Sequence, residues 1–313
     1  MAEDLATIAT SGGDYTTLAA CEAGEQKDYD TANNYGLWRV DSVFADTTRV
    51  SVDGSVTSAA DYIEIRVAPA VRHVGIYSTS KYRLEADGGF DAVLDLSDPY
   101  VRAVGLQIKN TAGSQPAMKV RNVADCRAEK ILVYGSGGAG IHNNATSDFY
   151  ELTAINCIVY GCTGDGFYAE NVGEFRAYNC DLCGNGGSGC EVEAGASVLT
   201  NCYAGGNTGA DYAKGLGSIT FTTTYSEDGS LSTPTAAYST SSGCYFTNIT
   251  GGSEDFHIGT SSTLKDAGTD LSGTFTDDID GDTRSGTWDI GADEYVAAGG
   301  GASAVPAMMA HNE

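Results

Sequence analysis

Two glutamates, Glu191 and Glu193, have the residue type and spacing that acid–base chemistry requires. They stand two positions apart, so on a β-strand their side chains lie on the same face. Asp165 and Glu170 precede them by about one turn of the repeat described below. Because glycoside hydrolysis requires two carboxyl groups that flank a sugar, Glu191 and Glu193 are the candidate catalytic residues of this sequence.

Basic residues, which a polysaccharide lyase needs to stabilise its anionic intermediate, are scarce around these glutamates. Arg176 is the only Lys or Arg between Tyr134 and Lys214. The histidines occur singly, with no spacing typical of a metal site: His73, His142, His257 and His311. We therefore expect His142 to be a surface residue and the protein to be non-enzymatic, with an enzyme as the alternative.

A turn rich in aspartate lies in residues 277–282, where acidic residues surround Gly281. Oxygen-rich loops of this kind hold Ca²⁺, which makes Asp278, Asp280 and Asp282 candidate calcium ligands. The downstream glutamate of an EF-hand is missing at its spacing, and Arg284 stands close enough in sequence to pair with one of these acids. The alternative is a hydrogen-bonded turn without metal, and we expect no other cofactor.

These residues belong to a chain that repeats about every 22 to 26 residues between Val101 and Gly215. When four glycines are aligned, three columns of mostly apolar residues appear. The glycines are Gly135, Gly161, Gly184 and Gly206, and the columns are Ile131, Cys157, Cys180 and Cys202; Val133, Val159, Leu182 and Ala204; and Ile141, Phe167, Cys190 and Tyr212. The alternation within each repeat indicates strands that turn one face inward, so we expect Tyr168 and Tyr178 on the surface, where they could stack on sugars.

The glycine-rich segments after each strand run predict corners, because glycine adopts positive φ at no steric cost. Between the corners there is no room for a helix of about ten residues. Short strands and stacked corners predict an all-β fold, a single-stranded parallel β-helix with about three strands per coil. The leucine-rich repeat has an overlapping period, but it requires a dense leucine core that these columns lack.

The sequence divides into three parts. Residues 1–24 form an N-terminal cap, in which the run from Asp14 to Glu22 predicts a short helix that closes the open end of the solenoid. Residues 25–296 form the β-helix, including a C-terminal closing segment. Residues 297–313 are a Gly/Ala-rich tail, either floppy or an arm that orders against a neighbouring subunit through Met308 and Met309.

The formal net charge of −25 argues against nucleic acid, anionic membranes and polyanionic substrates as partners. No run of about twenty apolar residues predicts a membrane span. Residues 1–4 are acidic where a secretory signal peptide needs positive charge, so we expect synthesis in the cytoplasm. In that compartment the cysteines are expected to be reduced and packed as small hydrophobes, with a disulfide between neighbouring coils as the alternative.

Segments near both ends of the chain are similar to those of a known group. Residues 266–271 (DAGTDL), 278–284 (DIDGDTR) and 288–295 (WDIGADEY) resemble the closing segment of right-handed parallel β-helix proteins of the pectin-lyase-like class. Residues 12–18 (GGDYTTL) are similar to the start of the same group. Such proteins occur in tailed-bacteriophage particles and on bacterial surfaces. The paired aspartates and Gly-His-Gly signatures of pectate lyases and polygalacturonases are not found in this sequence.

The resemblance implies a right-handed coil and, in its phage branch, a protein that is made in the host cytoplasm and joins the virion. We therefore expect a non-enzymatic structural protein of a bacteriophage particle, first of all a head-surface decoration protein whose partners are other virion proteins. The alternative is a phage tailspike, fibre or surface β-helix that binds or cleaves polysaccharide, with cell-surface glycans as partners. Phage β-helices often form trimers, so a homotrimer is a further expectation, although nothing in the sequence resembles a trimerising coiled coil.

Overall fold

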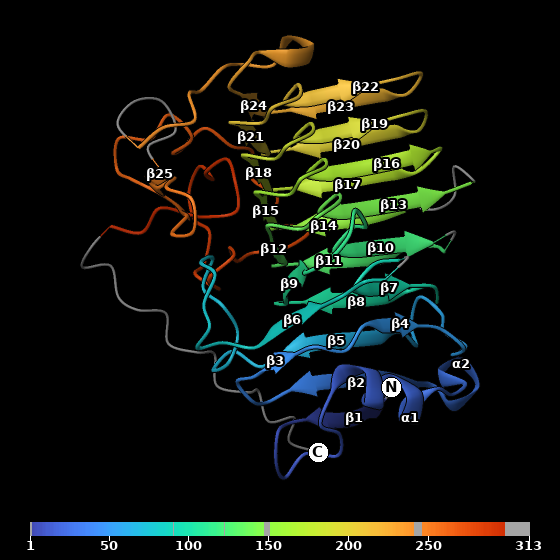
Figure 1. The fold of residues 1–313 in the computed structure, drawn as a ribbon. Coiled ribbons are helices and arrows are strands. Elements are labelled where there is room, and N and C mark those ends of the chain that lie inside the picture. The colour runs from blue at the N-terminus through green and yellow to red at the C-terminus, as the bar shows by residue number, and fades with distance from the viewer. Residues whose placement is uncertain (1, 90, 122, 147–150, 241–245, 298–313) are drawn as a thin grey trace.

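The chain winds into a solenoid of three parallel β-sheets that share one axis (Figure 1). This computed structural model describes residues 2–89, 91–121, 123–146, 151–240 and 246–297. Each complete coil contributes one strand to each sheet, and strands inside a sheet pair in parallel with their counterparts in the coils before and after. The predicted single-stranded parallel β-helix is therefore confirmed.

The sheets are named here in the order in which each coil visits them. The first sheet contains β1 (Ala2–Ile8), β2 (Asn34–Val40), β5 (Ile63–Val67), β8 (Val101–Val104), β11 (Cys126–Glu129), β14 (Glu151–Ile155), β17 (Glu174–Tyr178), β20 (Ala196–Thr200) and β23 (Ser218–Thr222). The second contains β3 (Ala45–Asp46), β6 (Arg83–Ala86), β9 (Gln107–Asn110), β12 (Leu132–Tyr134), β15 (Ile158–Tyr160), β18 (Asp181–Cys183), β21 (Tyr203–Gly205) and β24 (Tyr225–Ser226). The third contains β4 (Val50–Val52), β7 (Leu94–Leu96), β10 (Met118–Arg121), β13 (Ile141–Ala145), β16 (Phe167–Asn171), β19 (Cys190–Val192) and β22 (Tyr212–Lys214).

The apolar columns of the repeat form the core of the solenoid. Ile141, Phe167, Cys190 and Tyr212 are successive partners in the third sheet, and each is at most 1% exposed. The two other columns are fully buried in the same cluster. Stacking equal positions gives each coil an apolar face that only its neighbours cover, which is the energetic reason for the repeat.

Two corners per coil use a residue in the left-handed conformation. The corner between the second and third sheets is made by the four aligned glycines, whose φ angles lie between +56° and +69°. The corner between the first and second sheets uses mainly asparagine, namely Asn156, Asn179 and Asn201, with φ between +50° and +54°. Asparagine tolerates this region better than other residues with a Cβ atom, and its amide remains free for hydrogen bonds.

Helix α1 (Leu18–Glu25) closes the N-terminal end, as predicted, with Leu18 and Cys21 fully buried in the core. A second short helix, α2 (Tyr29–Ala32), follows it. The N-cap of α1 is Thr17, whose side chain accepts from the backbone N of Ala20 at 3.1 Å. Asp14, where the sequence run begins, instead accepts from the backbone and hydroxyl of Thr7, so the helix starts later than the run suggested.

The C-terminal part of the chain adds no coil after β24 and packs on the outside of the second sheet. Beyond the 3₁₀ turn η1 (Ser230–Ser232), it contains the antiparallel hairpin β25 (Phe246–Asn248) and β26 (Asp255–Ile258). In Figure 1 this orange and red segment lies beside the strands of the second sheet. All three residues of β12, β15 and β18 are buried, because the core covers one face and this segment covers the other.

The structure also bears on the expectations for membrane spans, cysteines and the C-terminal tail. No helix of the described residues is long and apolar enough to cross a membrane. Eight cysteines of the described residues are buried free thiols. The C-terminal tail lies outside the described residues from residue 298 onward, and so do Met308 and Met309.

Candidate functional site

Glu191 belongs to an outward column of polar side chains on the third sheet. Strand pairing places it in register with residues of the preceding coils: Asp95, Lys119, His142 and Tyr168. The rings of His142 and Tyr168 lie 4.9 Å apart, and His142 Nε2 is 3.1 Å from Glu170 Oε2. The His142 side chain is only 11% exposed, so it is not the surface histidine that we predicted. Burial lowers its pKa to about 4.

Glu193 follows β19 and is held by two hydrogen bonds from the coil before it. Tyr168 Oη donates to Glu193 Oε1 at 2.6 Å, and the backbone N of Asn171 donates to Oε2 at 3.1 Å. These hydrogen bonds favour the ionised form and lower the pKa of Glu193. Burial and the nearby carboxylates Asp165 and Glu193 have the opposite effect on Glu191, whose pKa is raised.

A raised and a lowered pKa on neighbouring carboxyl groups is the pattern of an acid paired with a base. The placement of Glu191 and Glu193 limits what this pair can do. They lie on the same side of one chain segment, whereas glycoside hydrolysis requires carboxyl groups on two sides of the bond. Both oxygens of Glu193 already accept hydrogen bonds, and Tyr168, predicted to be free for stacking on a sugar, uses its hydroxyl to hold Glu193.

Of the three candidate calcium ligands, Asp278 and Asp280 direct their carboxylates at different partners, and Asp282 is bonded to Asp278 through its backbone N–H and oxygen. Oδ1 of Asp278 accepts the backbone N–H groups of Asp280, Gly281 and Asp282, at 3.0, 2.9 and 2.8 Å. Its Oδ2 accepts from the backbone N of Glu294 at 3.1 Å. Asp278 therefore holds the turn and the end of the closing segment together, while the carboxylate of Asp280 turns away toward His257.

Arg284 joins this turn to the side of the solenoid. Its side chain is fully buried, and Nη2 donates to Asn156 Oδ1 at 3.0 Å and to the backbone oxygen of Ala292 at 2.7 Å. Nη1 pairs with Glu294 at 3.2 Å. The ion pair suggested by the sequence is thus made with Glu294, outside the aspartate turn. The most distinctive residues of the closing segment are used to attach it.

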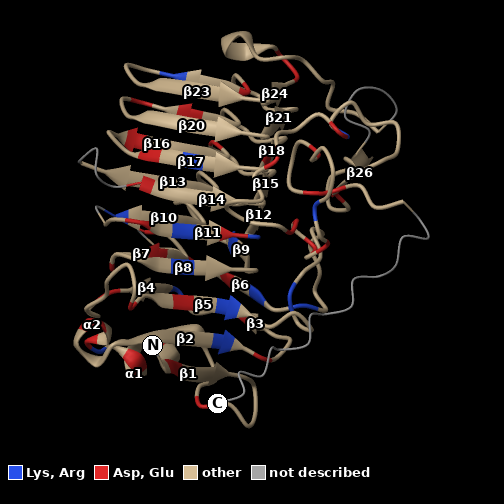
Figure 2. Cartoon of the chain, turned by 180° about the vertical axis from the view of Figure 1, so that it is seen from behind, with Lys and Arg blue, Asp and Glu red and all other residues tan. Residues whose placement is uncertain are grey.

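A row of arginines lies on the outward face of the first sheet, a surface that was not predicted from the sequence. Arg102 and Arg127 are direct partners, and Arg176 follows across Thr153 (Figure 2). The three line a groove of about 380 Å³ together with Tyr178. Arg127 is 3.5 Å from Glu129, and Arg176 pairs with Glu151, so acids offset much of the positive charge. These arginines are about one or two coils apart in sequence, so they do not form a recognisable motif. Their alignment follows only when the length of the repeat is applied to them.

A larger cleft of about 860 Å³ separates the second sheet from the β25–β26 hairpin. We call it the tyrosine cleft, because Tyr77, Tyr134 and Tyr160 line it, opposite Glu254 and Asp255. The rings of Tyr77 and Tyr134 lie 4.1 Å apart, and Lys109 Nζ is 5.1 Å from the Tyr134 ring centre. Aromatic faces beside a few fixed polar groups are typical of small-ligand sites of this size. No pattern in the sequence predicted the cleft, because its two walls come from segments far apart in the chain.

The fold and these surfaces define the class: a parallel β-helix whose side is covered by its own C-terminal segment. No protein-family model matches the sequence, and no curated protein does. Among solved structures the chain is similar to the pectate lyase Pel9A, with a TM-score of 0.46 and 13% identity over 94% of this chain and 97% of that one. At this identity the similarity concerns the fold alone.

Proposed function

We propose that this chain is a non-enzymatic structural protein of a bacteriophage particle, a rigid β-helical rod on the head surface. The observation that carries the structural role is the attachment of the closing segment. Its distinctive polar residues, Asp278, Arg284 and Glu294, are buried and bonded to one another and to the solenoid. They are therefore used for rigidity, and little of their chemistry is left for a substrate. The phage setting rests on the resemblance of the two end segments described above.

The outward carboxylates support a non-enzymatic role. Glu193 is fixed by two hydrogen bonds, and Glu191 approaches any ligand from the same side as Glu193. The partners we propose are other virion proteins, in a host-made particle. Repeated side chains on flat sheet faces offer such partners an extended surface.

The experiment locates the protein in particles of the phage that encodes it. Mass spectrometry of purified virions and gold-labelled antibodies on micrographs should find the chain on the head, in many copies. Sedimentation of the purified protein tests the homotrimer. Absence from the particle would contradict the proposal. So would cleavage of a bacterial polysaccharide, measured as released reducing ends, that is abolished by Glu191→Gln or Glu193→Gln.

Binding of a cell-surface glycan is a second candidate function, and the tyrosine cleft is the observation that favours it. Tyr77 is half-buried and lines the cleft together with Lys109 and Glu254. A glycan array with the whole protein should show binding that Tyr77→Ala weakens at least tenfold. Tyr35→Ala, in β2 of the first sheet, is the matched control, because Tyr35 is also half-buried and lines neither this cleft nor the groove lined by the arginines. This variant should bind as the unmodified protein does. Equal binding by both variants would remove the cleft from consideration.

A further inference from the structure

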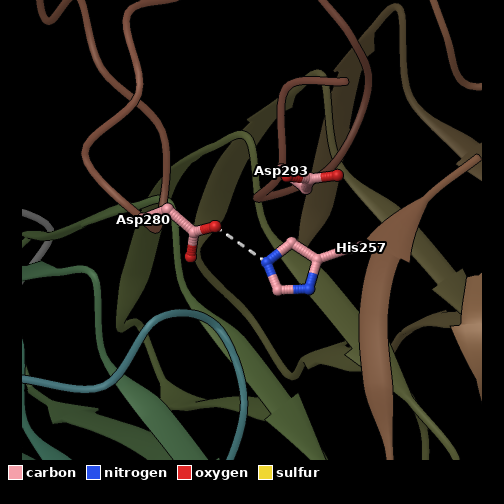
Figure 3. Close-up of side chains that lie close together, drawn as sticks. All are labelled: His257, Asp280 and Asp293. Carbon is pink, nitrogen blue, oxygen red and sulfur yellow. Dashed lines mark hydrogen bonds and ion pairs between the residues drawn. The ribbon is translucent and has the colours of Figure 1, made fainter. Parts of the chain in front are cut away.

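His257 lies where three distant segments of the covering C-terminal part meet. It belongs to β26, while Asp280 comes from the aspartate turn and Asp293 from the end of the closing segment. One imidazole nitrogen of His257 and one carboxylate oxygen of each aspartate lie within 4.8 Å of one another. Figure 3 shows the Asp280 carboxylate aimed at the imidazole, with Asp293 beside it. The distance from His257 Nε2 to Asp280 Oδ2 is 2.9 Å.

The other ring nitrogen of His257 is already held by a carboxylate. Nδ1 lies 2.5 Å from Asp255 Oδ1, two residues earlier on the same strand. Histidines that bind metal ions almost always donate their second N–H to a carboxylate or carbonyl, which fixes the ring and directs the first nitrogen at the metal. Asp293 is oriented in a comparable way, because its Oδ2 accepts the backbone N–H of Ile258 at 2.8 Å.

Apart from His257, which lies within ion-pairing distance of Asp255 and Asp280, no cationic side chain among the described residues pairs with the carboxylates of this cluster. Asp293 is 6% exposed, and the neighbouring Asp181 is 1% exposed. Oδ1 of Asp280 and Oδ1 of Asp181 are buried with no hydrogen-bond partner among the described residues. The nearest guanidinium groups are used elsewhere: Arg72 donates to the backbone oxygen of Asp280, and Arg284 to Glu294 and Asn156. The second oxygen of each of these two aspartates is bonded, Asp280 Oδ2 to His257 and Asp181 Oδ2 to the backbone N of Ala292. A buried carboxylate oxygen without a partner is costly, so the cluster has oxygen ligands to offer.

We propose that His257, Asp280 and Asp293 bind one divalent transition-metal ion, with Zn²⁺ as the best fit, and that Asp255 positions the histidine. One imidazole nitrogen and two carboxylates form a three-ligand set that water completes to four-coordinate geometry. Ca²⁺ fits less well, because it takes six to eight oxygen ligands and Asp278 has both oxygens engaged by backbone amides. Only Asp280 is shared with the calcium ligands suggested by the sequence.

Such an ion would fasten the hairpin, the aspartate turn and the end of the closing segment to one another. The aspartate turn and the closing segment are already joined by several hydrogen bonds, such as that from Glu294 to Asp278. The hairpin is joined to the closing segment by the bond from the backbone N of Ile258 to Asp293. Because metal binding requires the folded arrangement of three segments, its free energy adds to the stability of the folded state. The ion would act as a structural staple on the side of the solenoid.

The test uses the full chain, stripped with chelator and titrated with Zn²⁺, Mn²⁺ and Ca²⁺ by calorimetry. We expect one equivalent of Zn²⁺ to bind more tightly than Mn²⁺, and Ca²⁺ to bind least. His257→Gln and Asp293→Asn should each weaken Zn²⁺ binding at least a hundredfold. Asp255→Asn should weaken it by about 10- to 100-fold, as expected of a positioning residue. His142→Gln, which removes another histidine beside a carboxylate, is the control and should bind Zn²⁺ unchanged.

A second measurement covers variants that fold poorly. Co²⁺ added to the unmodified protein should give the intense visible absorption of four-coordinate cobalt, and one equivalent of Zn²⁺ should displace it. One equivalent of Zn²⁺ should also raise the melting temperature of the stripped protein. Absence of stoichiometric binding, binding that survives in His257→Gln, or a preference for Ca²⁺ would each overturn the proposal.

Discussion

Arg284 Nη2 donates to the side-chain oxygen of Asn156 at 3.0 Å, across 128 residues of sequence. Asn156 forms the corner of one coil, and Arg284 belongs to the segment that covers the second sheet. The bond therefore joins the solenoid to its cover at a point that water does not reach. The predictions about stability below concern this contact between the solenoid and the C-terminal part, and the core of the solenoid.

Replacing Arg284 by alanine should destabilise the protein strongly. The change leaves Glu294 buried without its partner and removes the donors to Asn156 and Ala292. Breaking a buried ion pair costs about 3–5 kcal/mol, because one charge stays uncompensated. Arg176→Ala is the control, since Arg176 is 55% exposed and its pair with Glu151 is worth about 0–1 kcal/mol. Urea unfolding of both variants measures the difference. Equal losses of unfolding free energy would contradict a stabilising role of the buried Arg284–Glu294 pair.

Asn179 should tolerate glycine better than alanine. Its side chain donates to the backbone oxygens of Asp289 and Gly291, at 2.9 and 3.0 Å, and its φ is +50°. Both variants lose these hydrogen bonds, at about 1 kcal/mol each, but only alanine adds about 1–2 kcal/mol of left-handed strain. Thermal or urea unfolding of the pair separates the two contributions. Asn171→Ala, at an exposed position with φ +56°, loses only a long bond of 3.5 Å to Asn144 and should show the strain with little else.

The buried imidazole of His73 should make the protein less stable in acid. Nε2 faces the backbone oxygen of Lys130 at 2.9 Å, and Nδ1 accepts from the backbone N of Gly75, an arrangement that suits the neutral ring. Burial lowers the pKa of His73 from 6.5 to about 4, with Arg72, Lys130 and Asp280 as the charged groups around it. Between these two pH values His73 is protonated in the unfolded chain and neutral in the folded protein.

The stability contributed by neutral His73 is therefore complete above pH 6.5 and is lost as the pH falls toward 4, at about 1.4 kcal/mol per pKa unit. Buried carboxyl groups such as Asp95 and Asp211, whose pKa burial raises to about 6, contribute a slope of opposite sign in this range. The measure is therefore the difference between two urea-unfolding series from pH 7 to pH 4, in which His73→Gln should lose less stability in acid than the unmodified protein. His142, whose pKa is also lowered to about 4, remains in that variant and leaves part of the slope. Parallel curves for the two proteins would contradict the assignment to His73.

The core cysteines should be unreactive until the protein unfolds. Cys157, Cys180 and Cys202 are fully buried, and burial raises the pKa of Cys126 and Cys162 to about 12. In a Cys244→Ser variant, a coloured thiol reagent at pH 8 should find no reactive thiol in the native state and eight after unfolding in denaturant. Fewer than eight would reveal a disulfide, and rapid native reaction would contradict the buried placement.

Much of the solenoid could be predicted from residues alone. Ile141, Phe167, Cys190 and Tyr212 recur at the period of the coil, and stacking makes each a neighbour of the next. Gly135 and its equivalents mark corners because few residues other than glycine adopt positive φ without strain. These patterns are local and repeated, so they can be recognised in the sequence without knowledge of contacts between distant segments.

The C-terminal part could not be predicted in this way. Its residues 266–295 are distinctive, but nothing in their spacing says that they lie against Asn156, Asn179 and Asn201. The calcium interpretation of the aspartate turn shows the same difficulty, because the direction of the Asp278 oxygens depends on amides from Gly281 and Glu294. The spacing of residues in the sequence shows which residue types a site contains. It does not show which atoms their side chains face.

The sequence by itself therefore determined the β-helix, its corners, its apolar columns and its capping helix, since each follows from periodicity and backbone preference. Only the tertiary structure decided that the closing segment lies along the second sheet, that the tyrosine cleft opens beside it, and that His257 meets Asp280 and Asp293. The physical reason is that these contacts join segments through single, unrepeated side chains. Such contacts leave no period in the sequence and become visible only when the chain is folded.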